Sequence, residues 1–549
     1  MVTTFRDRPW FVTFMVCLIV AAVYAPGFNG FWHGDDLPNL HRAYSQSQQD
    51  TLWIETLRLF VAPVPSQGAF YRPMMMLSLA ANYALFDAHY AGWYLINFAV
   101  HLANTLLVAL IVRRLAGGCQ CDARMAAPLA ALFFGLSPVL AEGVYWVSAR
   151  SDGWVTLLTL TGAYLWAGTP LKDAGKAAFA LPLMVLLALG FKESAAVVPL
   201  QMVLLAMAWP RRLTRAQCGA IGATFLAAAL FLAWRVYLFG NAWHVYSPAA
   251  GDTPAMHLRI WQALLSLPPW WQGMTVATPS LSAAYLVLSI IGAVAYAITG
   301  ASEYAIAARR QQAIMVLALI CASGGLVLAT LLNLGSMSSS GEGGRLSYGP
   351  IAWLALGLGV FMSTPFGTAR HPRWRIGGGA TMAAAVAVGS LVLLGQMQRV
   401  WAAQANLRAI TASIPGWVET HRGLTMLLVP ENDGAVVLTR NAQGGIVLAP
   451  IQSQPYLHRV VPTLTSEVEL RQDQFCSGLA TRLDIVRPRL ADDATMKSVL
   501  LPAETVWPAH VGCWSTREQR IIAIKPPPMD SACSSWLDSI RAEIASCGN

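Results

Sequence analysis

Long apolar runs separated by short polar segments make up the chain as far as about residue 400. A helix that crosses a bilayer needs about 20 mostly apolar residues, within a range of roughly 17–25. The pattern therefore predicts an all-α polytopic membrane core with about eleven transmembrane helices. The predicted spans are 10–26, 93–112, 126–141, 153–169, 178–191, 194–209, 217–239, 281–300, 313–334, 347–365 and 377–396.

The first apolar run has two interpretations. Arg6 and Arg8 precede it, as basic residues precede the apolar part of a signal peptide. However, no small-x-small cleavage site stands before Pro26-Gly27, so we interpret the run as a retained span.

Beyond residue 400 charged residues become frequent and the apolar runs shorten. Leu424–Val429, Ala435–Leu438 and Ile446–Leu448 are separated by turn-forming residues and predict strands, and 534–546 predicts a helix. We therefore expect two domains: a membrane domain at 1–400 and a small soluble α/β domain at 401–549.

Composition supports a membrane protein. Of 549 residues, 56% are hydrophobic and 12% are charged, whereas an ordinary soluble protein has about 25% charged residues. This composition excludes a soluble enzyme, a disordered chain and a nucleic-acid-binding protein, despite the net charge of +9. With eleven spans, fifteen Lys and Arg residues fall in loops on one side, which predicts a cytoplasmic N-terminus and an extracytoplasmic 401–549 domain.

Four of the nine cysteines lie in the predicted outer domain. An even number outside the cytoplasm favours two disulfides, and four cysteines allow three pairings. We expect Cys476–Cys513 and Cys533–Cys547 as the pairing to test. The Cys119-Gln-Cys121 pair on the other side is too small a set to indicate a zinc site.

Ionisable residues at the predicted outer ends of spans suggest chemistry, because a charge at the bilayer centre costs about 2.5–3.5 kcal/mol or more. Asp35 and Asp36 follow the first span and could provide a general base; a solvated loop, or an N-cap by Asp36, is the alternative. Arg72, in Tyr71-Arg72-Pro73, has the planar fork that binds phosphate; snorkelling to the membrane surface is its alternative.

Three further outer turns carry charges. Glu142, Arg150 and Asp152 share one turn, where a structural ion pair would explain two of the three. Lys192-Glu193 separates two short apolar runs, where a desolvated pair is costly unless it has a role. Arg345 lies in a glycine-rich segment just before Tyr348.

Acids and cations thus converge on one membrane face, which indicates a site for a phosphate-bearing lipid and acid–base chemistry. An ion-coupled transporter would place charges near mid-membrane and show repeated halves, and the sequence contains no such repeat.

These motifs, in this order, resemble those of the multispan GT-C glycosyltransferases, which use a polyprenyl- or dolichyl-phosphate sugar as donor. The closest resemblance is to the branch of the transmembrane tetratricopeptide-repeat O-mannosyltransferases and their bacterial relatives, although the repeats are absent here and no His precedes Pro138. The matching segments are Gly34-Asp35-Asp36, Tyr71-Arg72-Pro73, 94–104, 136–152, Lys192-Glu193, Arg345 with Tyr348, and 398–401.

The resemblance implies roles for these residues. Asp35 or Asp36 would act as the base or orient the acceptor, and the donor phosphate would be held by four cations. Those cations are Arg72, Lys192, Arg345 and, more weakly, Arg150; Glu142, Asp152, Glu193 and Tyr348 would support them. A divalent metal is compatible with the reaction, but no specific ligand set is present.

The resemblance further implies a multi-pass protein of the bacterial inner (cytoplasmic) membrane. Its partners would be a polyprenyl-phosphate-linked sugar donor, a protein or cell-envelope glycan acceptor and membrane lipid, with no nucleic acid. A lipid-linked sugar transporter or flippase without transferase activity is the alternative. The outer domain could also recruit the acceptor.

Overall fold

A computed structural model describes the chain over most of its predicted membrane part and a portion of its C-terminal part. The described residues are 9–32, 36–62, 71–168, 174–209, 212–240, 303–334, 344–365, 372–421, 425–429, 434–440, 446–450, 510–515, 517–518 and 520–524. The contacts between Cα atoms divide the chain into two units. One is Met1–Asn29 with Pro38–Met397, and the other is Gly30–Leu37 with Gln398–Asn549.

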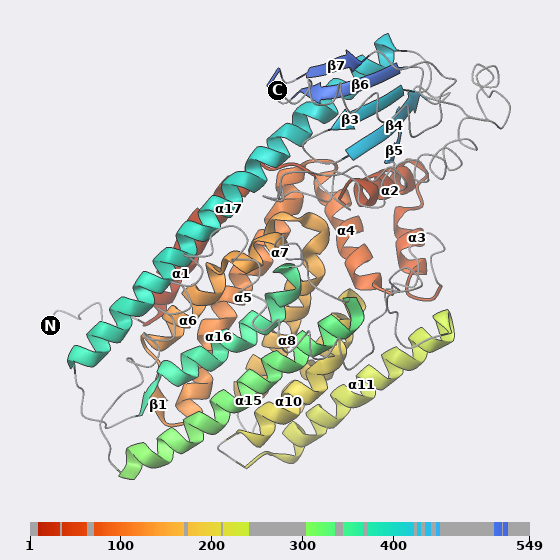
Figure 1. Ribbon diagram of the computed structural model, residues 1–549. Coiled ribbons are helices and arrows are strands. Elements are labelled where there is room, and N and C mark those ends of the chain that lie inside the picture. The colour runs from red at the N-terminus through yellow and green to blue at the C-terminus, as the bar shows by residue number, and fades with distance from the viewer. Residues whose placement is uncertain are drawn as a thin grey trace. The chain divides into compact units, whose positions relative to one another are not determined.

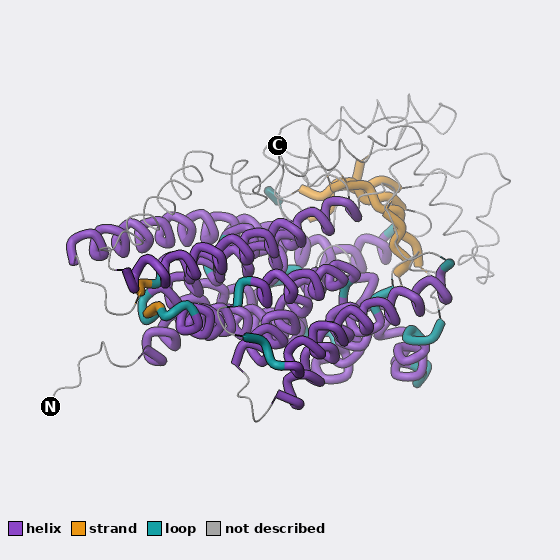
Figure 2. Tube along the Cα trace, turned by 90° about the horizontal axis from the view of Figure 1, so that it is seen from below, coloured by secondary structure: helices purple, strands orange, loops and turns teal. Residues whose placement is uncertain are grey.

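The first unit is helical, and its long helices lie side by side in a bundle (Figures 1 and 2). Its α-helices are α1 (Pro9–Tyr24), α2 (Asp36–Gln48, whose first two residues belong to the other unit), α3 (Leu52–Arg58), α4 (Pro73–Phe86), α5 (Tyr90–Gly118), α6 (Ala126–Gly135), α7 (Ala141–Tyr145), α8 (Arg150–Gly168), α9 (Ala174–Phe191), α10 (Val198–Met207), α11 (Arg215–Phe239), α15 (Glu303–Leu334), α16 (Tyr348–Met362) and the first part of α17 (Pro372–Thr420). Short 3₁₀ segments η2 (Ala25–Asn29), η4 (Pro138–Leu140), η5 (Val147–Ala149), η7 (Glu193–Val197) and η8 (Gly344–Ser347) join some of them. A two-stranded ribbon pairs β1 (Cys121–Asp122) with β2 (Thr364–Pro365).

The predicted spans within the described residues are mostly helical, but 126–141 is interrupted at Leu136-Ser137 and 347–365 ends in the strand β2. The predicted span 281–300 lies outside the described residues. Among the described residues, four stretches are long and apolar enough to cross a membrane by length and composition: Phe11–Asn29, Tyr90–Gly118, Arg215–Phe239 and Arg345–Met362. Pro73–Phe86, Ala126–Gly135, Ala180–Phe191 and Glu193–Met207 are apolar but shorter. The helical character of the core is thus confirmed, while the number of eleven spans stays a prediction.

Local sequence explains where α11 begins and ends. The Thr214 hydroxyl accepts a hydrogen bond from the backbone N–H of Gln217, and the Gln217 side chain accepts one from the backbone N–H of Thr214, which completes a capping box. At the other end Gly240 adopts a left-handed conformation, with φ of 74°, that glycine enters without steric cost.

Helix α5 lies at the centre of this bundle, in contact with α1, α4, α6, α8 and α16. Asn97, His101 and Asn104 recur at helical spacing on α5 and are all buried. Each bonds to a neighbouring backbone carbonyl: Asn97 to that of Trp146, His101 to that of Gly135 and Asn104 to that of Gly153. Polar side chains in an apolar environment need such partners, so this stripe holds the helices together.

The second unit contains a five-stranded sheet in the order β5-β4-β3-β6-β7. Its strands are β3 (Thr425–Val429), β4 (Gly434–Arg440), β5 (Ile446–Pro450), β6 (His510–Ser515) and β7 (Arg520–Ile524). Strands β3 and β6 are parallel, with Met426 opposite Val511, and the other pairs are antiparallel. The three predicted strands are confirmed as β3, β4 and β5, whereas 534–546 lies outside the described residues.

Within this unit the end of α17 packs on the sheet. Trp514 of β6 is buried and donates its indole N–H to the Asn406 side-chain oxygen at 2.8 Å. A Cβ on Gly512 would lie 2.8 Å from the Trp417 ring, so glycine allows the helix to approach β6. Helix α17 has 49 residues and spans about 74 Å at 1.5 Å per residue, far more than a hydrocarbon core of about 30 Å. The predicted span at 377–396 is therefore only part of a longer helix.

Five of the cysteines are free: Cys17, Cys119, Cys121, Cys218 and Cys321. Cys513 on β6 is disulfide-bonded, and Cys476, Cys533 and Cys547 lie outside the described residues. The pairings Cys476–Cys513 and Cys533–Cys547 stay predictions.

Candidate functional site

Arg72 and Glu193 form the first part of a buried charged site in the helical unit. Arg72 directly precedes Pro73, the first residue of α4, and residues before proline are kept out of the helical conformation. Its side chain donates through Nε at 3.2 Å and Nη2 at 3.0 Å to Glu193 Oε2. On the other carboxylate oxygen, Glu193 Oε1 accepts from Arg235 Nη1 at 3.4 Å.

Lys192 forms a second ion pair, beside the first. Its Nζ lies 2.7 Å from both carboxylate oxygens of Asp152, and both side chains are largely buried. Burial lowers the pKa of Lys192; Asp152 raises it, while Arg72 and Arg345 lower it. Both arginines therefore act electrostatically on Lys192.

Arg345 forms a third ion pair. Its Nη1 lies 3.1 Å from Glu142 Oε1, and its backbone N–H donates to Glu142 Oε2 at 2.9 Å. The guanidinium carbon also lies 4.1 Å from the centre of the Trp146 ring, within cation–π range. Glu142 thereby fixes η8 to α7.

We call these seven side chains the ion-pair cluster: Arg72, Glu142, Asp152, Lys192, Glu193, Arg235 and Arg345. The cluster holds four cations and three carboxylates, a formal charge of +1. Arg345 is 31% exposed and Arg72 is 19% exposed, whereas Arg235 is fully buried. The two most accessible members are therefore arginines, the side chains best shaped to bind phosphate.

The predicted grouping of Glu142, Arg150 and Asp152 differs from the observed one. Glu142 pairs with Arg345 and Asp152 pairs with Lys192. Arg150 is 1% exposed, and it donates to the Val147 carbonyl at 3.1 Å and to the Ser78 carbonyl at 3.4 Å. The bond to Ser78 ties the start of α8 to α4, and the role of Arg150 at the donor phosphate stays a prediction.

Tyr348 also serves helix packing. It is 1% exposed, and its hydroxyl donates to His101 Nδ1 at 2.6 Å. His101 Nε2 then carries the proton that bonds to the Gly135 carbonyl at 3.0 Å. Tyr348 thus fixes α16 to α5.

The predicted acids lie in the segment that follows α1 and η2. Asp36 is the first residue of α2 and is 1% exposed, and a carboxylate is favoured at the positive end of a helix. Asp35 lies outside the described residues. The catalytic role of Asp35 or Asp36 stays a prediction.

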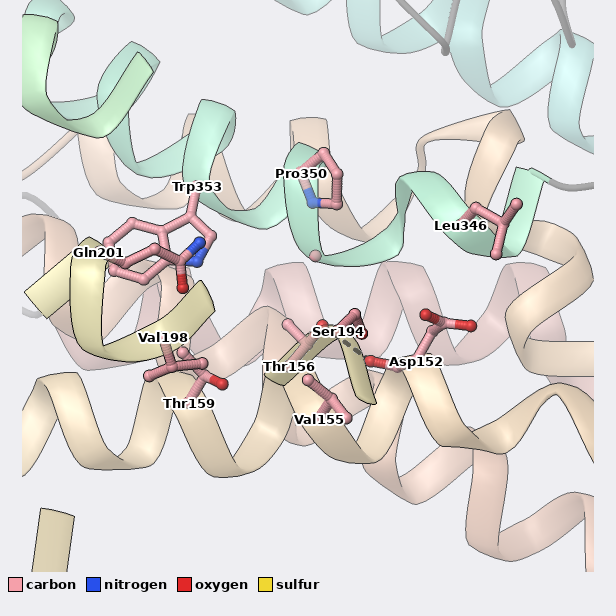
Figure 3. A pocket seen from close by; sticks show the side chains of 11 residues that line it. Asp152, Val155, Thr156, Thr159, Ser194, Val198, Gln201, Leu346, Pro350 and Trp353 are labelled. Atoms are coloured by element: carbon pink, nitrogen blue, oxygen red, sulfur yellow. Dashed lines mark hydrogen bonds between the residues drawn. The ribbon is translucent and has the colours of Figure 1, made fainter. Parts of the chain in front are cut away.

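A small cavity with both polar and apolar walls lies beside Asp152 in the helical unit (Figure 3). Asp152, Thr156 and Thr159 lie on one face of α8 and line it, opposite Ser194 and Gln201. The space open to the centre of a water-sized sphere is about 20 Å³, which suits one or two water molecules and is far too small for a sugar. Among the described residues the buried Thr159 hydroxyl and Gln201 Oε1 have no hydrogen-bond partner, so bound water would satisfy both.

Sequence reasoning missed Arg235. It lies inside the apolar run of α11, four residues before Phe239 at the end of that helix, where an arginine is costly without a partner. A single arginine within this apolar run could have indicated, from the sequence alone, a buried ion pair. Over the described part of the chain, no three His, Cys, Asp or Glu residues are grouped to hold a metal ion.

No known protein family matches the chain, and no curated protein matches it in sequence. Among solved structures, the cryo-EM structure of arabinofuranosyltransferase AftD from Mycobacteria is similar, with 16% identity and a TM-score of 0.39. The similar region covers 77% of this chain and 29% of AftD, so the chain spans less than a third of that protein's length. A similarity at this level does not establish a function.

Proposed function

We propose that the protein is an integral-membrane glycosyltransferase that moves a sugar from a polyprenyl-phosphate carrier to an acceptor hydroxyl on the extracytoplasmic face. The acceptor would be a protein or a cell-envelope glycan. One observation carries the proposal: the ion-pair cluster unites four cations with three carboxylates in an apolar helical unit and exposes two arginines.

The charge of the cluster matches the donor. A sugar linked to a lipid monophosphate is a phosphodiester with one negative charge, and the cluster has an excess of one positive charge. The cluster with its bound donor would then carry no net charge, and an uncompensated charge is costly where the dielectric constant is low. In the proposal Arg72 and Arg345 contact the phosphate, and Lys192 contributes its charge from behind them.

The proposed reaction is a substitution at the anomeric carbon of the sugar. The acceptor oxygen forms the new bond to that carbon while Asp35 or Asp36 accepts the hydroxyl proton. The bond from the carbon to the phosphate oxygen breaks, and the electron pair stays on the phosphate. The cations stabilise this growing negative charge, which is the main way in which a preorganised site lowers such a barrier.

The test uses the full-length protein in lipid nanodiscs. Undecaprenyl phosphate, a lipid that carries the proposed leaving group without a sugar, should bind at least about 10-fold more tightly than undecaprenol. Arg345→Ala should remove most of this preference. Arg58→Ala is the matched control, because Arg58 is a 67% exposed arginine paired on the surface with Glu55. Equal binding of the two lipids to the wild-type protein would contradict the proposal.

Activity is then measured with undecaprenyl-phosphate hexoses and pentoses and an envelope extract as acceptor. Release of undecaprenyl phosphate together with labelled acceptor supports a transferase. Movement of intact donor across the bilayer, without release of the lipid phosphate, would instead support the flippase alternative.

A further inference from the structure

We propose that Arg235 is a positioning residue that sets the phosphate affinity of the ion-pair cluster without touching the phosphate. This inference rests on the proposed function, because it concerns the same donor site. The two oxygens of the Glu193 carboxylate are divided between two arginines: Oε2 accepts from Arg72 and Oε1 from Arg235.

The two arginines differ in access to a ligand. Arg72 is 19% exposed, whereas Arg235 has no exposed side-chain surface. A phosphate that reaches this trio therefore meets Arg72 and not Arg235. Any effect of Arg235 on the ligand must pass through Glu193 or act through the electric field.

Aromatic packing holds both arginines at the same carboxylate. Tyr71, next to Arg72 in the chain, packs its ring 5.3 Å from Phe231 and 5.9 Å from Phe239, centre to centre. Both phenylalanines belong to α11, as does Arg235, whose guanidinium lies 5.5 Å from the Phe239 ring. The α11 helix thus places the second arginine while the Tyr71 contact places the first.

The consequence is a difference in charge. One arginine and one glutamate form a neutral pair, whereas two arginines that share a glutamate carry a charge of +1. Arg235 draws part of the Glu193 charge away from Arg72 and supplies the positive excess of the cluster. Without Arg235, Glu193 would neutralise Arg72 and the formal charge of the cluster would fall from +1 to zero.

The test is a set of charge variants of the full-length protein in nanodiscs, with undecaprenyl phosphate as the probe and undecaprenol as the control lipid. Arg235→Met should weaken phosphate-dependent binding by about 10-fold or more, from the loss of one nearby charge at an effective dielectric constant of about 20. Arg235→Lys should bind within about 3-fold of wild type, because it keeps the charge. Glu193→Gln/Arg235→Met, which restores the +1 balance, should recover most of the binding.

A purely structural arginine would not give this order, because the double variant would be no better than Arg235→Met. Wild-type affinity in a folded Arg235→Met variant would overturn the inference and leave the proposed function standing. If the wild-type protein bound undecaprenyl phosphate no more tightly than undecaprenol, both the proposed function and the inference about Arg235 would be contradicted.

Removal of one partner from a buried pair can prevent folding. If Arg235→Met does not fold, Glu193→Gln and Glu193→Gln/Arg235→Met are compared instead. The single variant should bind at least about 10-fold more tightly, since only it keeps the extra charge. Equal affinities would overturn the inference.

Discussion

Lys192 and Glu193 are consecutive in the chain but form ion pairs with different residues. Lys192 pairs with Asp152 at 2.7 Å, while Glu193 pairs with Arg72 at 3.0 Å. Lys192 has extended backbone angles, φ −163° and ψ 142°, and successive side chains of an extended segment point to opposite sides. One break between α9 and η7 thereby joins two ion pairs whose other members lie at the starts of α8 and α4.

Removal of one charge of the Lys192–Asp152 pair should lower the free energy of unfolding more than removal of both charges. Lys192→Met leaves a buried carboxylate, which typically costs about 3–5 kcal/mol, whereas Lys192→Met/Asp152→Leu removes both charges and should recover most of that stability. Unfolding in mixed detergent micelles measures the difference. A double variant no more stable than Lys192→Met would show that the pair itself is not the source of the stability.

Phosphate binding should weaken at alkaline pH because of Lys192. Burial lowers its pKa below the ordinary value of 10.5, so the ammonium loses its proton at a lower pH than in an unfolded chain. The charged form should bind the phosphate more tightly, so affinity should fall as the pH rises through the lowered pKa. Binding of undecaprenyl phosphate is measured across pH in nanodiscs.

The control for that measurement is Lys192→Arg, which stays charged throughout the range. Its affinity should lack the alkaline decline. The same decline in this variant would assign the titration to another group.

The same lowered pKa has an effect of opposite sign on stability. Between the folded and unfolded pKa values the unfolded chain binds more protons at Lys192, so this residue makes stability rise with pH in that window. Stability and phosphate binding should therefore respond to alkaline pH in opposite directions, which separates a loss of affinity from unfolding.

Loss of the catalytic acid should affect turnover more than donor binding. Asp→Asn at the true base, Asp35 or Asp36, should slow transfer by about 10²–10⁴-fold, because loss of a general base typically has an effect of that size. Affinity for undecaprenyl phosphate should change little. Wild-type turnover in both folded single variants and in the double variant, with saturating donor, would refute the assignment.

The C-terminal domain should lie in an oxidising compartment. Without reductant, a thiol reagent should fail to label Cys476, Cys513, Cys533 and Cys547 in the folded protein, and mass mapping should show Cys476–Cys513 and Cys533–Cys547. A reporter fused after residue 549 should be active only outside the cytoplasm. Labelling of all four cysteines, or cytoplasmic activity of the reporter, would contradict the predicted orientation.

Regular structure was largely predictable because its causes are local. The apolar runs that become α1, α5 and α11 are long enough to form helices by themselves, and α11 carries its own capping residues. The strands β3, β4 and β5 are short apolar runs bounded by turn-forming residues. Strands β6 and β7 escaped prediction because β6 pairs with β3, which lies more than 80 residues earlier in the chain.

By itself the sequence determined a helical membrane core, a C-terminal region with strands and a set of ionisable residues in apolar surroundings. Hydrophobicity and charge are properties of each segment and do not depend on its neighbours. Only the tertiary structure decided which charges meet: Lys192 with Asp152 across 40 positions, Arg345 with Glu142 across 203, and Arg235 with Glu193 across 42. Helix packing chooses these partners, because a buried charge must be compensated by whichever opposite charge the neighbouring helices bring within reach.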